Sequence, residues 1–265
     1  MDTLNNDRIR QVVRENYGQI ADAGTSCCDS SSCCTPSAQE PQLLSLQLGY
    51  SLLDLSAAPA GANLGLGCGN PQAIANLQPG ETVLDLGSGA GFDCFLAARQ
   101  VGTNGYVIGV DMTPQMISKA RANAETDGYD NVDFRLGEIE HLPVADASVD
   151  VIISNCVINL SPDKGSVFAE AYRVLRPGGR LAVSDVVAFA KVPDEVRGDM
   201  ALLSSCISGA EEIGIVEKLL KDAGFEQVLV APKGESKTFM AEWAPDTPIT
   251  DYVVSATIEA RQPAA

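Results

Sequence analysis

The chain has 265 residues, of which 45% are hydrophobic, and its formal net charge is −17 with only 18 Lys and Arg residues. An α/β domain of this length can bury a full core as a single unit. The few, dispersed cations argue against nucleic acid or an anionic membrane as a partner, and no apolar run approaches the ~20 residues that would span a bilayer.

The first segment, Met1 to Arg10, is polar and carries acids, so it lacks the basic-then-apolar order of a secretory signal. We therefore expect a cytosolic protein. In the cytosol the eight cysteines stay reduced, which favours metal, metalloid or redox chemistry over a disulfide scaffold. Nothing in the sequence demands a partner chain, and we expect a monomer.

Residues 1–71 are predicted to form an N-terminal helical and Cys-rich arm. Apolar residues at helical spacing predict a helix over Asp7–Ala21, and a second apolar-periodic segment covers 43–55. Between them lies a Ser-, Cys- and Thr-rich loop. Residues 59–71 are too rich in Gly and Pro for regular structure, so backbone can approach a ligand closely there.

The cysteines fall into two groups. Four crowd the polar loop as Cys27-Cys28 and Cys33-Cys34, whereas Cys68, Cys94, Cys156 and Cys206 occur singly. Thiolate sulfur is the preferred ligand of soft ions, and scattered cysteines can converge in a fold as well as paired ones. A soft-ligand site on an enzyme is indicated. The crowded loop alone is also compatible with a surface metal trap.

From residue 81 onward, strands and helices alternate at the spacing of βαβ units, which predicts an α/β fold with a Rossmann-like, seven-stranded, mostly parallel sheet. Residues 72–187 would form the cofactor domain, and 188–265 an extension on the substrate side with closing strands. A tight turn is expected at Pro177-Gly178-Gly179. The predicted strands are Thr82–Leu86, Tyr106–Val110, Val132–Leu136, Val149–Ser154, Arg180–Asp185, Gln227–Val230 and Val253–Glu259, and the predicted helices are Phe92–Val101, Pro114–Thr126, Lys164–Leu175 and Glu211–Ala223.

A glycine-rich turn, Gly87-Ser88-Gly89-Ala90-Gly91, follows the first of these strands and precedes a helix. Glycines let such a turn tighten and let a ligand touch backbone. The spacing differs from that of dinucleotide-binding turns, and Asp85 stands just before it. A pyrophosphate would be repelled by this carboxylate, whereas a sulfonium and an α-amino group would be attracted, which favours S-adenosylmethionine over NAD.

Two further segments complete the predicted cofactor site. The second strand ends at Asp111-Met112, where an acid can accept hydrogen bonds from both ribose hydroxyls. The third is followed by Gly137-Glu138-Ile139-Glu140, a loop placed to reach the adenine edge with Ile139 and Glu140. The three segments together resemble the successive motifs of class I S-adenosylmethionine-dependent methyltransferases.

Asn155 and Cys156 come directly after the fourth strand, in Ser154-Asn-Cys-Val-Ile-Asn-Leu160. Ligands of open α/β sheets bind at this carboxyl edge. Cys156 is therefore expected to point at the transferred methyl group, and Asn155 to line the cofactor site. Cys94, inside a predicted helix, is more simply a small buried hydrophobe.

Three segments are similar to the signatures of arsenite methyltransferases: Gly65-Leu-Gly-Cys68-Gly-Asn-Pro, the stretch from Ser154 to Lys164, and Cys206-Ile-Ser-Gly-Ala210, together with Asp111-Met-Thr113. The resemblance implies that Cys156 and Cys206 hold trivalent arsenic, with Cys68 as third thiol and 188–265 as an arsenic-binding extension. It also implies a partner cysteine in the N-terminal loop. Cys33 and Cys34 match best, although the second pair leaves the choice open.

The function implied is methyl transfer from S-adenosylmethionine to thiolate-bound arsenite, a detoxification, with an external thiol reductant such as glutathione or thioredoxin resetting the enzyme. Two alternatives remain: a methyltransferase of a small organic acceptor, and a non-catalytic metalloid-binding protein. The organic acceptor would not need three cysteines together. The binding protein would take up arsenic without releasing S-adenosylhomocysteine.

Overall fold

The computed structural model describes residues 3–23, 41–197, 199, 202–203, 206–245 and 247–264. The predicted participants Cys33 and Cys34, like Cys27 and Cys28, lie outside the described residues. No described helix is both long and apolar enough to cross a membrane.

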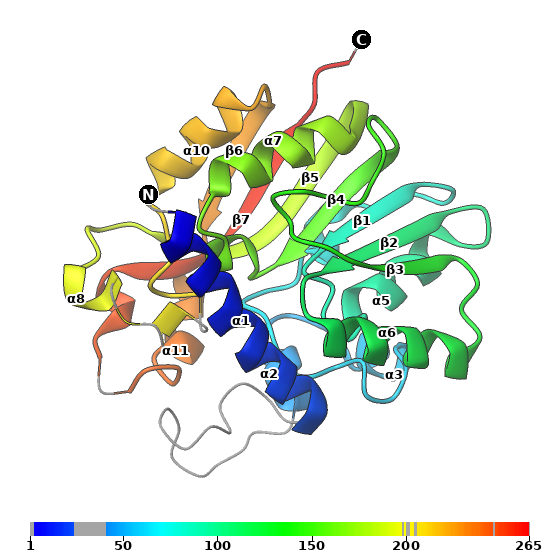
Figure 1. Cartoon of the computed structure of the whole chain (residues 1–265), viewed down its shortest axis with the longest axis horizontal. Helices are drawn as coiled ribbons and strands as arrows, with labels where there is room; N and C mark the ends of the chain where they lie inside the picture. The colour runs from blue at the N-terminus through cyan, green and yellow to red at the C-terminus, as the bar shows by residue number, and fades with distance from the viewer. Residues whose placement is uncertain are drawn as a thin grey trace.

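Seven strands form one sheet through the middle of the molecule, with the order β3-β2-β1-β4-β5-β7-β6 running from right to left in Figure 1. The first five strands are parallel, and β7 runs antiparallel between β5 and β6. The predicted mostly parallel sheet is confirmed. The strands are β1 (Thr82–Leu86), β2 (Tyr106–Asp111), β3 (Val132–Leu136), β4 (Val149–Asn155), β5 (Leu175–Ala188), β6 (Glu226–Pro232) and β7 (Val253–Arg261).

The helices before the sheet are α1 (Thr3–Ala23), α2 (Pro41–Gln47), α3 (Leu52–Ala57) and α4 (Gln72–Ala75); those between and after its strands are α5 (Phe92–Val101), α6 (Pro114–Asp127), η2 (Ile158–Leu160), α7 (Lys164–Val174), α8 (Asp194–Arg197), α10 (Ile213–Asp222), η3 (Gly234–Ser236), α11 (Lys237–Met240) and η4 (Ile249–Asp251). The single segment expected over 43–55 is in fact two helices. Gly49 has φ +97°, and Ser51 starts α3 with a capping box to Asp54.

Successive side chains of the central strands point to opposite faces of the sheet, and both faces are buried under helices. Leu84 and Leu86 of β1 share a core with α7 and α10, whereas Val83 shares the opposite core with α5 and α6. This period of two follows from the pleat of a strand. Because both faces are covered, these strands read as nearly continuous apolar runs, as in other parallel sheets.

β5 differs from its prediction. A tight turn at Pro177-Gly178-Gly179 was expected to precede a strand beginning at Arg180, but β5 already begins at Leu175. The pairing of β4 with β5 shifts register at this point, and Gly178 has φ +81°. The glycines therefore produce an irregularity within a long strand, a role that a turn-like sequence also allows.

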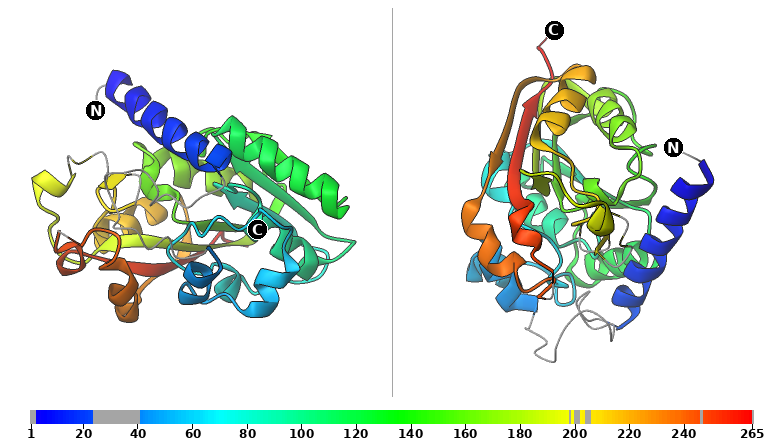
Figure 2. Two further views of the ribbon diagram at one scale, coloured as in Figure 1. Left: turned by 90° about the horizontal axis from the view of Figure 1, so that it is seen from below. Right: turned by 90° about the vertical axis from the view of Figure 1, so that its left-hand side faces the viewer.

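α1 lies on the outside of the molecule, along the carboxyl edge of the sheet (Figures 1 and 2). Its residue Val13 belongs to the same hydrophobic cluster as Cys156 and Leu160, which follow β4. Ile20, further along α1, clusters with Ala90 of the glycine turn. The N-terminal arm therefore covers the edge at which the sequence places the cofactor and thiol motifs.

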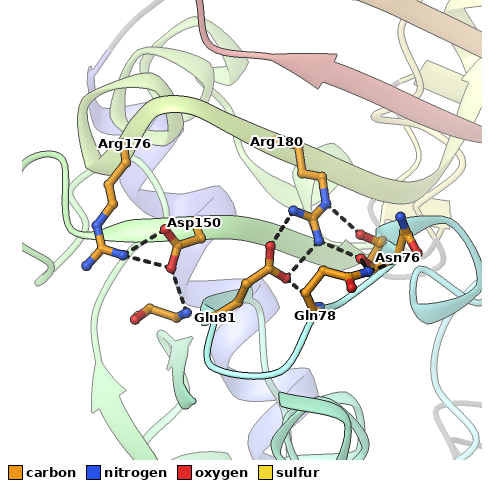
Figure 3. A network of polar contacts seen from close by, with 8 residues as sticks. Asn76, Gln78, Glu81, Asp150, Arg176 and Arg180 are labelled. Atoms are coloured by element: carbon orange, nitrogen blue, oxygen red, sulfur yellow. Dashed lines mark hydrogen bonds and ion pairs between the residues drawn. The ribbon is translucent and has the colours of Figure 1, made fainter. Parts of the chain in front are cut away.

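Two arginines join strand ends at the opposite, amino edge of the sheet (Figure 3). Arg180 forms two hydrogen bonds of 2.7 and 2.8 Å with the Glu81 carboxylate and also donates to the carbonyl oxygens of Ala75 and Asn76. Arg176 pairs with Asp150 at 2.7 Å. The side chains of Arg180 and Glu81 are 18% and 17% exposed, whereas Arg176 is 46% exposed.

Arg180→Ala should lower the free energy of unfolding by about 2–3 kcal/mol, somewhat less than breaking a fully buried ion pair, because Glu81 keeps partial access to water. Arg176→Ala, the matched control, should cost under about 1 kcal/mol as an exposed pair. Urea unfolding of both variants measures the difference. Equal losses would show that burial does not separate the two pairs.

Candidate active site

The glycine turn between β1 and α5 has three residues with positive φ: Gly87 (+70°), Gly89 (+51°) and Gly91 (+95°). A Cβ on Gly87 would lie 2.5 Å from Val157, and one on Gly91 would lie 2.6 Å from the Phe95 ring. A Cβ on Gly89 would meet nothing within 4 Å. Two of these glycines are therefore required by packing, while the third borders open space in which a ligand can approach the backbone.

Three carboxylates surround this turn. The Asp85 side chain is buried, with 3% exposure, and it accepts a hydrogen bond from the Cys94 thiol at 3.3 Å. Burial, followed by the charge of Asp93, holds the pKa of Asp85 well above its ordinary value, and burial raises the pKa of Asp93 to about 6. The third carboxylate is that of Asp111. In the described part of the chain, none of Asp85, Asp93 and Asp111 forms an ion pair with Lys or Arg.

Asp111 holds the turn in place from the end of β2. Its Oδ2 accepts a hydrogen bond from the Gly89 amide at 3.0 Å, and its Oδ1 accepts one from the Thr113 amide at 2.8 Å. Burial raises the pKa of Asp111, although these bonds oppose the shift. Each carboxylate oxygen has a further lone pair, so the group can still accept hydrogen bonds from a diol.

Ser88 supplies an unpartnered group in the same turn. Its Oγ is buried and forms no hydrogen bond within the described structure. A buried hydroxyl without a partner is costly unless a ligand satisfies it. Together with the unneutralised acids and the open space at Gly89, it fits a cationic ligand rich in hydroxyl groups. S-adenosylmethionine has this character.

The remaining predicted cofactor residues have partners within the protein. Glu140 is buried, and its Oε1 accepts hydrogen bonds from Ser161 at 2.7 Å and Arg10 of α1 at 3.0 Å. Ile139 packs into the core beneath β1, and Met112 packs beside the cluster that contains the thiols. Their contact with adenine or ribose stays a prediction.

Cys68, Cys156 and Cys206 converge in one buried cluster, although they come from the glycine-rich loop, the end of β4 and the segment before α10. The Sγ atoms of Cys68 and Cys156 and a carboxylate oxygen of Asp185 lie within 4.8 Å of one another. The Cys206 thiol donates to the carbonyl oxygen of Cys156 at 2.7 Å. Cys94 lies apart from this group, in the core beneath the glycine turn.

Asn155 fixes the loop that carries Cys68. Its Oδ1 accepts from the Cys68 amide at 3.0 Å, and its Nδ2 donates to the Gly69 carbonyl at 2.8 Å. Gly67 has φ +132°, and a Cβ there would lie 2.7 Å from the Asn155 amide. The role of Asn155 toward this loop was not foreseen from the sequence, where only its place beside the cofactor was expected.

The three thiols are uncharged at neutral pH. Burial holds the pKa of Cys156 well above the ordinary thiol value, with the neighbouring sulfurs adding to the shift, and burial likewise raises the pKa of Cys68. For Cys206 the side-chain hydrogen bond with the Cys156 thiol lowers the pKa, but burial and the charge of Asp185 together outweigh it. A buried group of this kind avoids carrying a charge.

Two polar residues beside the thiols were not predicted from the sequence to belong to the site. Asp185 and Asn159 are buried and hydrogen-bonded to each other at 2.9 Å. Asp185 stood at the end of the predicted fifth strand, on the carboxyl edge where ligands bind. That position was the available signal for its presence at the site.

A protein family described as a methyltransferase domain matches residues 77–224 of the chain. Together with the sheet order and the glycine turn, this match defines the chain as a class I S-adenosylmethionine-dependent methyltransferase. The chain is 54% identical over 97% of its length to an arsenite methyltransferase of Halobacterium salinarum, and 42% identical over 82% to one of Aquipseudomonas alcaligenes. It belongs to the arsenite methyltransferase family.

A solved structure agrees with this assignment. An arsenic(III) S-adenosylmethionine methyltransferase from Chlamydomonas reinhardtii is 33% identical, with a TM-score of 0.61, over 83% of this chain and 73% of that one. The present chain spans 68% of the Halobacterium relative and 62% of the Aquipseudomonas relative.

Proposed function

We propose that this chain transfers methyl groups from S-adenosylmethionine to trivalent arsenic held by Cys68, Cys156 and Cys206. The observation that carries the proposal is the convergence of three buried thiols beside the glycine turn. Membership in the arsenite methyltransferase family supports it.

The charge of the loaded site favours trivalent arsenic over a divalent metal. Arsenite and three thiols condense to a tris-thiolate with release of three waters, and the product is neutral. A divalent ion with three thiolates would carry a net negative charge next to the buried Asp185 carboxylate. Burying uncompensated charge is costly, whereas a soft, neutral tris-thiolate suits an apolar cluster.

The two halves of the site are adjacent. β1 pairs with β4 so that Leu86 lies opposite Ser154, and the Val157 side chain packs against Gly87. Donor and acceptor would therefore meet at one point of the sheet edge. S-adenosylmethionine supplies a methyl group on a cationic sulfur.

The arsenic lone pair is the nucleophile in this step. Attack needs no general base, because no proton leaves the acceptor. Alignment by the protein supplies the acceleration, for which up to ~7–11 kcal/mol is available in well-oriented reactions.

Turnover requires a reductant. Methyl transfer leaves arsenic formally pentavalent, and its return to the trivalent state takes two electrons. Two thiols supply them by forming a disulfide, which an external thiol such as glutathione or thioredoxin then reduces. A cysteine of the N-terminal loop, Cys33 or Cys34, is proposed as one of the internal thiols.

Cys156→Ser and Cys206→Ser should each abolish methylation, because a hydroxyl is a hard, protonated ligand that does not replace thiolate sulfur for arsenic. The assay incubates arsenite, S-adenosylmethionine and a thiol reductant with each variant and separates the arsenic products. Cys94→Ser, the same change in a buried cysteine outside the cluster, should still bind arsenic.

Substantial product from a folded Cys156→Ser or Cys206→Ser variant would contradict the thiolate proposal. Arsenic binding by wild type without release of S-adenosylhomocysteine would favour a non-catalytic binding protein. Failure to bind arsenic, with methylation of an organic acceptor, would favour the other alternative.

Cys68→Ser should separate the methylation steps. Arsenite has three exchangeable positions, whereas methylarsenite has one already filled by carbon and can be held by two thiolates. We expect loss of activity on arsenite and a measurable rate on methylarsenite under the same reductant. Equal loss on both substrates would assign Cys68 to a step that they share, such as internal reduction.

Arsenite binding should neither release nor take up protons at pH 7. The raised pKa values keep all three thiols protonated, so each S–H proton leaves with an arsenic hydroxyl as water. Calorimetric binding enthalpies should be the same in buffers of different ionisation enthalpy. Above the thiol pKa values, proton uptake should appear and binding should weaken. Uptake of one proton per thiol already at pH 7 would mean that the thiolates are preformed.

A further inference from the structure

Cys156 and Cys206 share an unusual backbone conformation. Both have φ +61°, in the left-handed region that residues with a Cβ rarely adopt. Cys156 follows β4 and Cys206 lies in the segment before α10, and both belong to the buried cluster that also contains Cys68. Such conformations persist only where surrounding contacts hold them, and they concentrate at functional sites.

Asn159 connects the two strained cysteines. It lies in η2, just after Cys156, and its Nδ2 group donates to Asp185 Oδ1 at 2.9 Å and to the Val186 carbonyl at 2.6 Å. A longer contact of 3.4 Å reaches the carbonyl oxygen of Cys206 itself. The backbone of Asn159 is equally close to this segment, since a Cβ on Gly209 would overlap its carbonyl oxygen.

Asp185 anchors the same turn from the sheet. Its Oδ2 accepts a hydrogen bond from the Ile158 amide at 3.0 Å, and its Oδ1 accepts from the Val186 amide at 2.7 Å in addition to Asn159. Asp185 is 2% exposed and Asn159 is 5% exposed. The carboxylate thus ties the segment after Cys156 to β5, while Asn159 extends that tie to Cys206.

We propose that Asn159 and Asp185 are positioning residues that hold Cys156 and Cys206 so that their two sulfurs bind one arsenic atom. The inference rests on the proposed function and deepens it. Both residues act by holding the segments that carry the two cysteines and not as arsenic ligands, although an Asp185 carboxylate oxygen lies within 4.8 Å of the Cys156 sulfur. Loss of the pair would leave two reactive thiols that no longer share the geometry needed to chelate, so bidentate binding falls while the reactivity of each single thiol is retained.

Phenylarsine oxide is a suitable probe, because its arsenic condenses with two thiols and releases water. The full chain is used with Cys27, Cys28, Cys33, Cys34 and Cys68 changed to Ser, which leaves Cys156 and Cys206 as the pair that can chelate. In this background Asn159→Ala should weaken phenylarsine oxide binding at least tenfold. The rate of modification of Cys156 and Cys206 by N-ethylmaleimide should stay the same or rise, and S-adenosylmethionine affinity should change less than twofold.

Asn131→Ala is the matched control. Asn131 also donates from its amide to two backbone carbonyls, those of Ala98 and Gly102, but it lies in the part of the fold that packs α5 against β2 and β3. Its loss should leave phenylarsine oxide binding unchanged. A folded Asn159→Ala variant with unchanged phenylarsine oxide affinity would overturn the inference.

If Asn159→Ala does not fold, Asp185→Asn decides the question, because it keeps the size of the side chain but turns one of the two acceptor oxygens into a donor, so the hydrogen bonds from Asn159 and from the Ile158 amide cannot both be kept. The same selective loss of bidentate binding supports the inference, and unchanged binding overturns it. If the background chain itself fails to bind phenylarsine oxide, the proposed dithiolate site is wrong and the inference falls with it. The background measurement therefore distinguishes the two failures.

Discussion

The parallel pairing of β1 with β4 is the constraint on which the rest of the site depends. With Leu86 opposite Ser154, the glycine turn after one strand and Cys156 after the other emerge side by side. Val157 then packs against Gly87, which leaves no room for a Cβ at that position. Strand register alone therefore places the glycine turn, where we propose that the methyl donor binds, next to Cys156, which we propose as an arsenic ligand.

Burial sets the chemistry that the edge can support. The acids around the glycine turn and the thiols beyond it are both removed from water, but the consequences differ. Carboxylates without a cationic partner attract a cation. Protonated thiols favour a ligand such as arsenite, because the arsenic-thiolate product is neutral. A cationic methyl donor and a neutral arsenic acceptor satisfy both conditions in neighbouring parts of the sheet edge that α1 covers.

Much of this arrangement could be predicted because it follows from local patterns. The glycine turn, Asp111 and Cys156 each stand at the end of a recognisable strand, and the carboxyl ends of parallel strands share one edge. Convergence of Cys68 and Cys206 was predicted only through family resemblance, since loop contacts are non-local. The tie from Asn159 to Asp185, and that from Asn155 to the Cys68 loop, depend on side-chain rotamers and on left-handed backbone that no period in the sequence reveals.

The arginine network at the amino edge has a consequence for how this protein can change. It stabilises the starts of β1, β4 and β5 (Figure 3). Cys156, which follows the end of β4, lies at the opposite edge of the sheet. Strength added at the amino edge would offset destabilising substitutions around the thiols without touching them. Since selection removes only those variants that fall below the stability needed for function, a stronger amino edge would let the chain accept substitutions that change metalloid preference at the thiols while the fold persists.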